Sequence, residues 1–232
     1  MGKTNQHGQP IGAPVESWTP PPVPPAKRHE GRTVTVEPLD RETHGPPLFE
    51  TLAAAPDSLW TYMSFGPFHD YHEFESTLKT IEHYPNLMPF AMVVDDEPLG
   101  FASYLRTAPR DGSIEIGSIV FSPQLQRTTP ATEALYLMMR NVFALGYRRC
   151  EWKCDDLNTV SRRAAERLGF IYEGTFRQAT LYKGRNRDTA WYAITDREWP
   201  DLDLAFQKWL SPYNFDSNGA QLRSLRQIRE GN

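Results

Sequence analysis

One stretch of the chain combines a strand, a short polar loop and the start of a helix, an arrangement that can bind an anion. The apolar run 114–121 predicts the strand, and Pro130 stands where the first helical residue is expected, with Thr129 as its cap. Backbone N–H groups at such a helix start suit a diphosphate, and Arg127 adds a cation. Many helices carry a Thr-Pro start for capping alone, so the loop by itself does not establish a site.

Two further sets of residues could serve as a covalent nucleophile or as metal ligands. Cys154 has the type of a covalent nucleophile, but it alternates with Cys150 and Trp152 on an apolar strand face, which favours a buried structural thiol. His69 and His72 are three residues apart on a predicted helix, a spacing that brings two side chains together. Without a third and fourth ligand at suitable spacing, they are interpreted as surface or substrate-wall histidines, and no metal is predicted.

The elements that must position these residues follow from hydrophobic periodicity. The predicted strands are 33–37, 90–94, 99–105, 113–121, 149–154, 171–182 and 188–195. The predicted helices are 42–55, 57–63, 69–84, 130–145, 158–168 and 196–210, with a further helical piece at 219–229. In the helix over 158–168, one apolar face is expected to carry Val160, Ala164, Ala165 and Leu168. Strand, helix and strand in succession across 113–154 imply one parallel pair in an otherwise antiparallel sheet, and therefore a mixed α/β fold.

Composition and charge restrict the class of protein. The chain has 232 residues, enough for one domain with tails, and 39% of them are hydrophobic, which excludes wholesale disorder. Its 25 Lys and Arg against 29 Asp and Glu give a net charge of −4, so neither a nucleic-acid nor a membrane partner is predicted. No apolar run approaches the roughly 20 residues of a membrane span, and no secretory signal is found. With only two cysteines, a cytoplasmic location is expected.

The two ends of the chain differ in composition from its centre. Seven prolines between Pro10 and Pro25 predict a disordered or extended arm over 1–31, of polyproline II character. Its PxxP spacing also fits an SH3-type ligand, but a spacer or an arm lying on the domain is favoured. The globular domain is predicted over 32–211, followed by a polar C-terminal tail over 212–232 that includes the helical piece.

Two motifs carry a family resemblance. The loop 126–131 aligns with the pattern Gln/Arg-x-x-Gly-x-Gly/Ala, with Thr129 in place of the first glycine, and 156–170 fits an Asn-x-x-Ser helix that ends in Gly-Phe. On these residues the sequence resembles the GNAT superfamily of acetyl-CoA-dependent N-acetyltransferases, most of all the branch with ribosomal-protein N-terminal acetyltransferases. The resemblance runs from about residue 33 to 199, and 176–192 resembles the closing hairpin of that branch.

The resemblance implies a fold and a cofactor site. The fold would be a mostly antiparallel twisted sheet with a parallel pair formed by its fourth and fifth strands, flanked by helices. Acetyl-CoA would bind where this pair splays, with its diphosphate on 126–131 and its pantetheine on the backbone near Ile119 and Val120. The cofactor-binding residues implied in this way are Ile119, Val120, Gln126, Arg127, Thr128, Thr129, Ala131, Asn158, Ser161 and Arg162. Arg163 and Arg167 are further candidates for the 3′-phosphate, although solvent-facing arginines fit the pattern equally well.

Glu115 is the candidate general base for an amine acceptor. An amine with a pKa near about 10.4 is protonated at neutral pH and must lose a proton before it attacks a thioester. Glu115 stands eleven residues before Gln126, the spacing of the catalytic glutamate in one histone-modifying branch of the family. It alternates with Ile114 and Ile116, so it faces the opposite side of the sheet from them. A solvated strand glutamate fits the alternation equally well.

The leaving thiolate has no obvious proton donor. Many family members place a tyrosine four residues before the glycine of the Gly-Phe pair, where this chain has Ala165. We favour a reaction without a dedicated acid, since an alkyl thiol with a pKa of about 8.5 is a tolerable leaving group. Ser161 is the second choice, through its hydroxyl or a bound water.

The acceptor site is predicted from aromatic residues before the 69–84 helix. Trp60, Tyr62 and Phe68 are interpreted as its wall, with core residues as the alternative. The predicted function is acetyl transfer from acetyl-CoA to a primary amine of a small molecule or a peptide N-terminus, by a monomer or a homodimer. A catalytically silent acyl-CoA sensor is the main alternative. A nucleotide-binding protein is disfavoured because no GxGxxG or GxxxxGK run is present.

Overall fold

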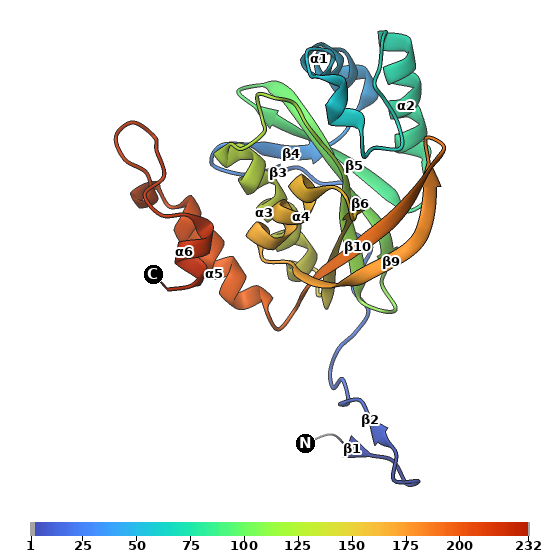
Figure 1. Cartoon of the computed structure of the whole chain (residues 1–232). Coiled ribbons are helices and arrows are strands. Elements are labelled where there is room, and N and C mark those ends of the chain that lie inside the picture. The colour runs from blue at the N-terminus through green and yellow to red at the C-terminus, as the bar shows by residue number, and fades with distance from the viewer. Residues whose placement is uncertain (1–2, 232) are drawn as a thin grey trace.

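The computed structural model describes residues 3–231 and shows an eight-stranded sheet with helices on both faces (Figure 1). The strand order is β3-β4-β5-β6-β7-β8-β10-β9, and only β7 and β8 are parallel. The strands are β3 (His29–Glu30), β4 (Thr35–Pro38), β5 (Leu87–Val94), β6 (Glu97–Ala108), β7 (Ser113–Phe121), β8 (Arg149–Asp155), β9 (Ile171–Tyr182) and β10 (Arg185–Thr195). The predicted mixed α/β fold with one parallel pair is therefore confirmed.

Helices cover both faces of the sheet, and each face has its own hydrophobic core. The α-helices are α1 (Arg41–Ala53), α2 (Tyr71–His83), α3 (Thr129–Ala144), α4 (Thr159–Leu168), α5 (Trp199–Leu210) and α6 (Leu225–Arg229), and the 3-10 helices are η1 (Asp57–Trp60) and η2 (Pro212–Asn214). Helices α1 and α2 pack on the sheet face that carries Phe101 and Val120. Helices α3, α4 and α5 cover the opposite face, where Ile114 and Ile116 are buried. Successive residues of β7 thus serve different cores, as strand alternation requires.

Local sequence signals explain where the helices begin and end. The Asp70 side chain accepts a hydrogen bond from Glu73 N at 2.9 Å and caps α2, which buries Phe74 and the apolar residues that follow at helical spacing. Gly169 ends α4 in the left-handed conformation, with φ 103°, which glycine adopts without steric cost. The N-cap of α3 is Thr128 and not the predicted Thr129, which is already helical, because Pro130 fits the second helical position as well as the first.

The β9–β10 hairpin closes through a tight turn at Lys183 and Gly184. Both residues have positive φ, 49° and 68°, as a two-residue type I′ turn requires. The hairpin is long and curls across the end of the sheet toward the α1–α2 layer (Figure 1). Strand β9 forms the edge of the sheet.

The chain ends are partly tied to the domain. The Trp18 indole donates to Gly146 O at 3.1 Å, and the Tyr147 hydroxyl donates to Pro22 O at 3.0 Å, so the Pro-rich arm lies along the domain there. Beyond it, a hairpin of β1 (Lys3–Thr4) and β2 (Pro10–Ile11) extends away from the body (Figure 1). At the other end, α6 is shorter than the helical piece expected over 219–229, and it buries Leu225 against the core.

Candidate active site

The centre of the sheet is split, and the split exposes strand backbone. Strand β8 pairs with β7 only from Ser113 to Glu115. Beyond Glu115, β7 bulges, because its register against β6 slips by one residue and Ser118 takes a φ of 50°. A non-glycine residue at positive φ is strained, and such strain gathers at functional sites. Backbone groups on the β8 side of this part of β7, which includes Ile119 and Val120, are thus left without a neighbouring strand.

The loop between β7 and α3 presents backbone N–H groups at a helix N-terminus. In the described part of the chain, the N–H groups of Arg127, Thr128 and Thr129 have no hydrogen-bond partner. The Thr128 hydroxyl accepts from Ala131 N at 3.3 Å, so that group is satisfied by the cap, and Pro130 has no N–H. Three consecutive free donors on a helix start can hold a diphosphate.

Two side chains of this loop differ in their availability. Gln126 donates from Nε2 to Phe121 O at 2.9 Å and so fixes the loop to the end of β7. Arg127 is exposed and has a φ of 61°. The structure therefore gives Gln126 a positioning role and leaves the Arg127 cation accessible to an anion.

The start of α4 is built by the two residues of the Asn-x-x-Ser motif. Asn158 is the N-cap, and its side chain accepts from Ser161 N at 3.0 Å. The Ser161 hydroxyl accepts from the Trp152 indole N–H at 3.0 Å. Both side chains thus hold α4 against β8. The apolar face of α4 is not buried at Val160, which is 75% exposed because it lies in the first turn beside the split strand, where no helix covers it.

Arginines on α4 lie in two different environments. Arg162 donates to Asp156 Oδ1 at 2.9 Å and to the Tyr192 hydroxyl at 3.0 Å, so its guanidinium is already occupied. Arg167 instead donates to the Thr132 hydroxyl at 3.1 Å, in the first turn of α3. Desolvation lowers the pKa of Arg167, and no described acid pairs with it. Arg167 is therefore better placed than Arg162 to contact a phosphate at the α3 N-terminus.

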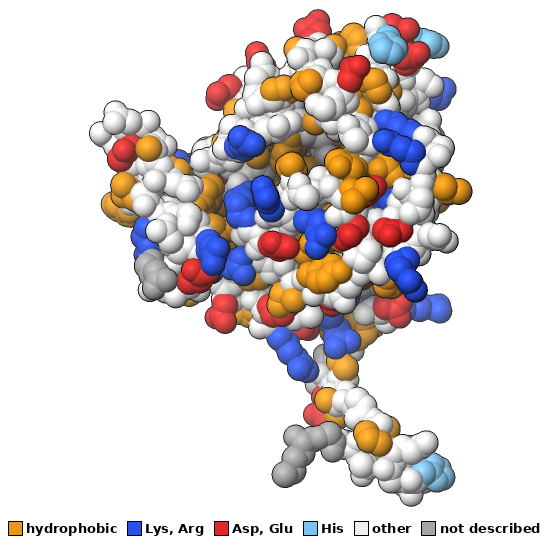
Figure 2. All heavy atoms as spheres, in the orientation of Figure 1, with side chains coloured by type: hydrophobic (Ala, Val, Ile, Leu, Met, Phe, Trp, Pro, Cys, Tyr) orange, Lys and Arg blue, Asp and Glu red, His pale blue; other side chains and the backbone are white. Residues whose placement is uncertain are grey.

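Cationic side chains gather on the surface over α3 and α4 (Figure 2). Arg229 of α6 donates to the backbone carbonyls of Glu166 and Arg167 at 3.1 and 3.2 Å. Arg229 thereby satisfies the C-terminal end of α4 and leaves the Arg167 side chain free to face α3.

Glu115 lies on the sheet face opposite its apolar neighbours, as predicted, but it is buried at 5% exposure rather than solvated. Its Oε2 accepts from Lys153 Nζ at 3.0 Å and from Arg106 Nη1. Its Oε1 points toward Gly117, because a Cβ built on that glycine would lie 3.0 Å from it. One carboxylate oxygen is thus fixed by cations, while the other faces the residue just before the bulge.

Lys153 connects Glu115 to a second carboxylate. Its Nζ lies 2.7 Å from Glu151 Oε2 and 3.7 Å from the centre of the Trp191 ring. Burial alone would raise the pKa of the Glu151 carboxyl, but hydrogen bonds from Arg149 and Lys153 outweigh burial and hold it below its usual range. This carboxylate therefore adds stability above its ordinary pKa and loses that contribution as the pH falls through its lowered pKa.

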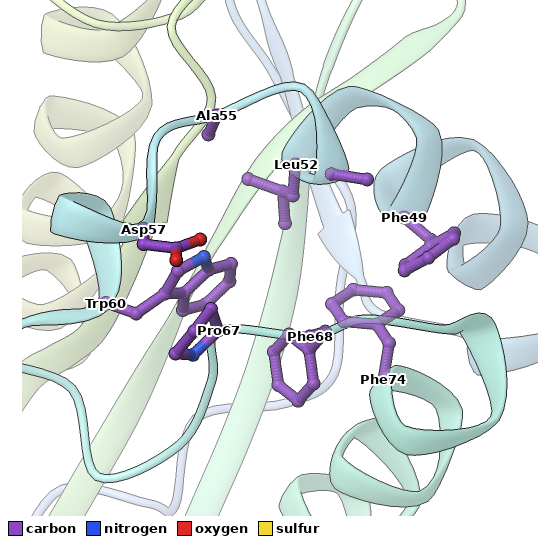
Figure 3. Close-up of a pocket in the computed structure, with 9 residues that line it drawn as sticks. Phe49, Leu52, Ala55, Asp57, Trp60, Pro67, Phe68 and Phe74 are labelled. Atoms are coloured by element: carbon purple, nitrogen blue, oxygen red, sulfur yellow. The ribbon is translucent and has the colours of Figure 1, made fainter.

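The aromatic residues predicted to line the acceptor site belong mostly to the core. Trp60 is 3% exposed and meets Phe68 edge to face, with ring centres 5.0 Å apart. Figure 3 shows both side chains around a small apolar cavity of about 20 Å³ between α1, η1 and α2, with Phe74 beside them. The burial of Trp60 favours the alternative of a core residue, whereas Phe68 is only partly buried and packs against that core.

Tyr62, the third residue predicted for the acceptor wall, contacts the segment that precedes α4. Its hydroxyl donates to Leu157 O at 3.2 Å, just before α4. The β9–β10 hairpin reaches the same segment, since Lys183 Nζ donates to Trp60 O and Arg185 Nη2 donates to Thr61 O, both at 2.8 Å. These contacts join the 60–62 segment to the elements that flank the split in the sheet.

Three functional candidates on the Glu115 face were not found from the sequence. Ser103 Oγ, Arg187 Nε and Trp191 Nε1 are buried without a hydrogen-bond partner in the described residues. Ser103 is the cross-strand neighbour of Gly117, and Trp191 that of Lys153. Alternation within β6 and β10 gives the face of each residue, but only the strand register brings them to Glu115.

Both cysteines are buried in the core on the opposite face of the sheet. Desolvation raises the pKa of the Cys150 thiol and of the Cys154 thiol, so thiolate is scarce at neutral pH. Cys154→Ala is therefore expected to keep kcat within about threefold of the unmodified protein, measured with any acceptor that the protein acetylates. A loss of 100-fold or more, with an unchanged melting temperature, would support a covalent acetyl-cysteine route instead.

The described residues give no sign of a metal centre or a membrane span. From residue 3 to residue 231, no group of three or more His, Cys, Asp or Glu side chains is arranged to hold a metal ion. No helix within that range is long and apolar enough to cross a membrane. A cavity of about 560 Å³ between β4, the β5–β6 turn and the start of α1 contains none of the predicted site residues.

Comparisons with known proteins agree with this geometry. The family profile described as "Acetyltransferase (GNAT) domain" matches residues 33–171. A GCN5-related N-acetyltransferase from Brucella melitensis is 43% identical, with a TM-score of 0.90, over 93% of this chain and 100% of that one. A probable GNAT-family acetyltransferase from Chromobacterium violaceum is 39% identical, with a TM-score of 0.79, over 83% of this chain and 98% of that one.

A third structure shares the fold at lower identity. RimJ from Mycobacterium smegmatis, in complex with CoA-disulfide, is 21% identical, with a TM-score of 0.62, over 72% of this chain and 84% of that one. At this identity the likeness shows the fold alone. A search of curated protein sequences found no match.

Proposed function

Because this chain belongs to the GNAT acetyltransferase family and is an acetyl-CoA-dependent acetyltransferase, we propose that it acetylates a primary amine by direct transfer, with Glu115 as general base. The observation that carries the proposal is the position of Glu115 Oε1, which faces Gly117 at the start of the bulge. A base there faces the part of β7 whose backbone is free to hold a thioester. The acceptor is a small-molecule amine or a peptide N-terminus, and the reducing cytoplasm suits the two free thiols.

The residues around the split fit the parts of acetyl-CoA. Free N–H groups of Arg127, Thr128 and Thr129 suit the diphosphate, with Arg167 as a nearby cation. Free backbone groups of β7 suit the amides of the pantetheine arm. A backbone N–H near Val120 supports the oxyanion that forms on the thioester carbonyl.

The chemistry then needs one proton transfer to the protein. Glu115 Oε1 takes a proton from the acceptor ammonium or amine, directly or through a water. The neutral amine nitrogen bonds to the acetyl carbon, the carbon–sulfur bond breaks, and the second proton of the nitrogen passes to the departing thiolate or to water, which leaves the amide and free CoA. Ala165 occupies the position where many family members have a tyrosine donor, and its side chain carries no acidic proton. We therefore keep a reaction without a dedicated acid, with Ser161 as the alternative donor.

The first test is mass spectrometry of a pooled amine panel incubated with acetyl-CoA. Short peptides with free N-termini, polyamines, amino acids and aminoglycosides make up the pool. We expect an enzyme-dependent mass gain of one acetyl group on one class. No adduct on any amine, with acetyl-CoA shown to bind by calorimetry, would favour a silent acyl-CoA sensor instead.

The cofactor site has its own test in a matched pair of arginine variants. Arg167→Gln is expected to weaken acetyl-CoA binding by about 10-fold, because it removes the cation beside the first turn of α3. Arg163→Gln removes an exposed arginine one turn earlier on the same helix and is expected to change the Kd less than twofold. Isothermal titration with acetyl-CoA measures both values. Equal effects of the two substitutions would remove Arg167 from the site.

A further inference from the structure

Two donor groups on β10, on the sheet face that carries Glu115, have no acceptor among the described residues. Arg187 Nε and Trp191 Nε1 are both buried and unpartnered among residues 3–231. Each of these nitrogens can donate a hydrogen bond and neither can accept one. Buried donors are almost always satisfied, so each of these nitrogens is expected to donate to a water or to an acceptor atom of a bound ligand.

These two groups share the sheet face of the proposed base. Trp191 pairs with Lys153 in the β10–β8 register, and its ring lies 3.7 Å from Lys153 Nζ, which in turn binds Glu115. Phe176 stacks on the other side of the indole at 4.5 Å and fixes its orientation. Arg187 is four residues before Trp191 on the same strand, so alternation places it on the same face.

No described acid forms an ion pair with Arg187, in contrast to three other arginines around the site. Arg106, Arg149 and Arg162 each form an ion pair. Asp155, the cross-strand neighbour of Thr189, accepts from the Tyr182 hydroxyl at 2.7 Å and from Leu157 N at 2.9 Å. The Arg187 guanidinium lies 6.0 Å from the centre of the Tyr182 ring.

The neighbours of Arg187 add positive charge rather than cancel it. Lys183 and Arg185 on the same hairpin donate to backbone carbonyls and not to carboxylates. Desolvation and the nearby Arg185 lower the pKa of Lys183. A ligand oxygen at Arg187 would therefore be stabilised most if it carried a negative charge.

We propose that the acceptor carries a carboxylate, which Arg187 and Trp191 bind while its amine faces Glu115. The inference rests on the proposed function and restricts it to amines with an anionic oxygen on the same molecule. Two sources share this chemistry: the α-carboxylate of a free amino acid, and an acidic side chain next to the amine of a peptide N-terminus. Polyamines and aminoglycosides lack such a group.

Matched acceptors test the proposal directly. One arm compares free α-amino acids with their α-carboxamides, and a second compares peptides with Asp or Glu at the second position with the Asn or Gln versions. In at least one arm we expect kcat/KM to be about 10- to 100-fold higher for the carboxylate. The arm that shows the preference identifies the source of the carboxylate.

Substitutions then test whether Arg187 and Trp191 cause the preference for a carboxylate acceptor. Arg187→Gln should reduce the ratio of kcat/KM for the carboxylate acceptor to kcat/KM for its amide to below about threefold. The change should come mainly from KM, and the Kd for acetyl-CoA should not change. Trp191→Phe keeps the ring on Phe176 and removes only the N–H, so it should lower the ratio by a smaller factor. Arg177→Gln, which removes an exposed cation from the same hairpin, is the matched control and should keep the ratio.

The outcomes separate this proposal from the function on which it rests. Acetylation of amides or polyamines as fast as carboxylates overturns the carboxylate site and leaves the acetyltransferase intact. A preference that survives Arg187→Gln also overturns it, as does a loss of acetyl-CoA binding in that variant with an unchanged ratio. If no amine gains an acetyl group, the proposed function fails as well.

Discussion

Glu115→Gln is expected to lower kcat by about 100- to 1,000-fold at pH 7, while the Kd for acetyl-CoA stays within about twofold. The amide keeps the size of the side chain but cannot take the acceptor proton from Oε1. The loss should be largest at low pH, where most of the amine is protonated, and should shrink as the pH approaches the pKa of the amine. A kcat profile from pH 6 to 10 measures this change.

The matched control is Glu151→Gln. Both glutamates bind Lys153, at 3.0 and 2.7 Å, so each substitution removes one ion pair of the same buried lysine. Only Glu115 also faces Gly117 at the bulge. The control should therefore keep the shape of the pH profile. If Glu115→Gln gives a profile parallel to that of the unmodified protein, a different group or water alone removes the proton.

Lys153→Met is expected to destabilise the fold by about 3–5 kcal/mol, the largest effect that we predict on stability. The Lys153 side chain is 3% exposed, and its removal leaves Glu115 and Glu151 without their shared cation. Urea unfolding measures the change in free energy. The control is Lys79→Met on the exposed side of α2, which should change the free energy by less than about 0.5 kcal/mol.

A double variant separates the lost charge pair from lost packing. Adding Glu115→Gln to Lys153→Met removes one of the two stranded carboxylates. The double variant should therefore be more stable than Lys153→Met alone, by about 1–2 kcal/mol. If the two substitutions simply add, Lys153 supports the core through its aliphatic chain and the buried charges matter little.

Periodicity in the sequence predicts faces and elements well, and the helix α2 and strand β7 show why. Phe74 and Leu78 recur at helical spacing and are both buried, and Ile114 alternates with Glu115 across the sheet. Such patterns arise within one element, so a sequence contains them in full. The parallel pairing of β7 with β8 also follows, because a helix must connect two neighbouring parallel strands.

Contacts between distant segments are what the sequence leaves open. Lys153 reaches Glu115 through the short β7–β8 ladder, and Trp191 reaches Lys153 through the β10–β8 register, neither of which follows from spacing along the chain. The aromatic residue Trp60 looks the same in a sequence whether it lines a wall or fills a core. Its burial depends on how α1 and α2 meet.

The split between β7 and β8 also determines how the sheet holds together as a mechanical unit. Five strands, β3 to β7, lie on one side of the split and three, β8 to β10, on the other, and a ladder of three residue pairs joins them. Among the ladders that join strands β4 to β10, this one has the fewest residue pairs, so the two halves of the sheet are expected to separate there first when the molecule fluctuates. A bound molecule whose amides pair with β7 and whose phosphates rest on α3 replaces part of the missing ladder. Binding of this molecule is therefore expected to stabilise the folded state, because the molecule joins the two halves of the sheet where no strand pairing joins them.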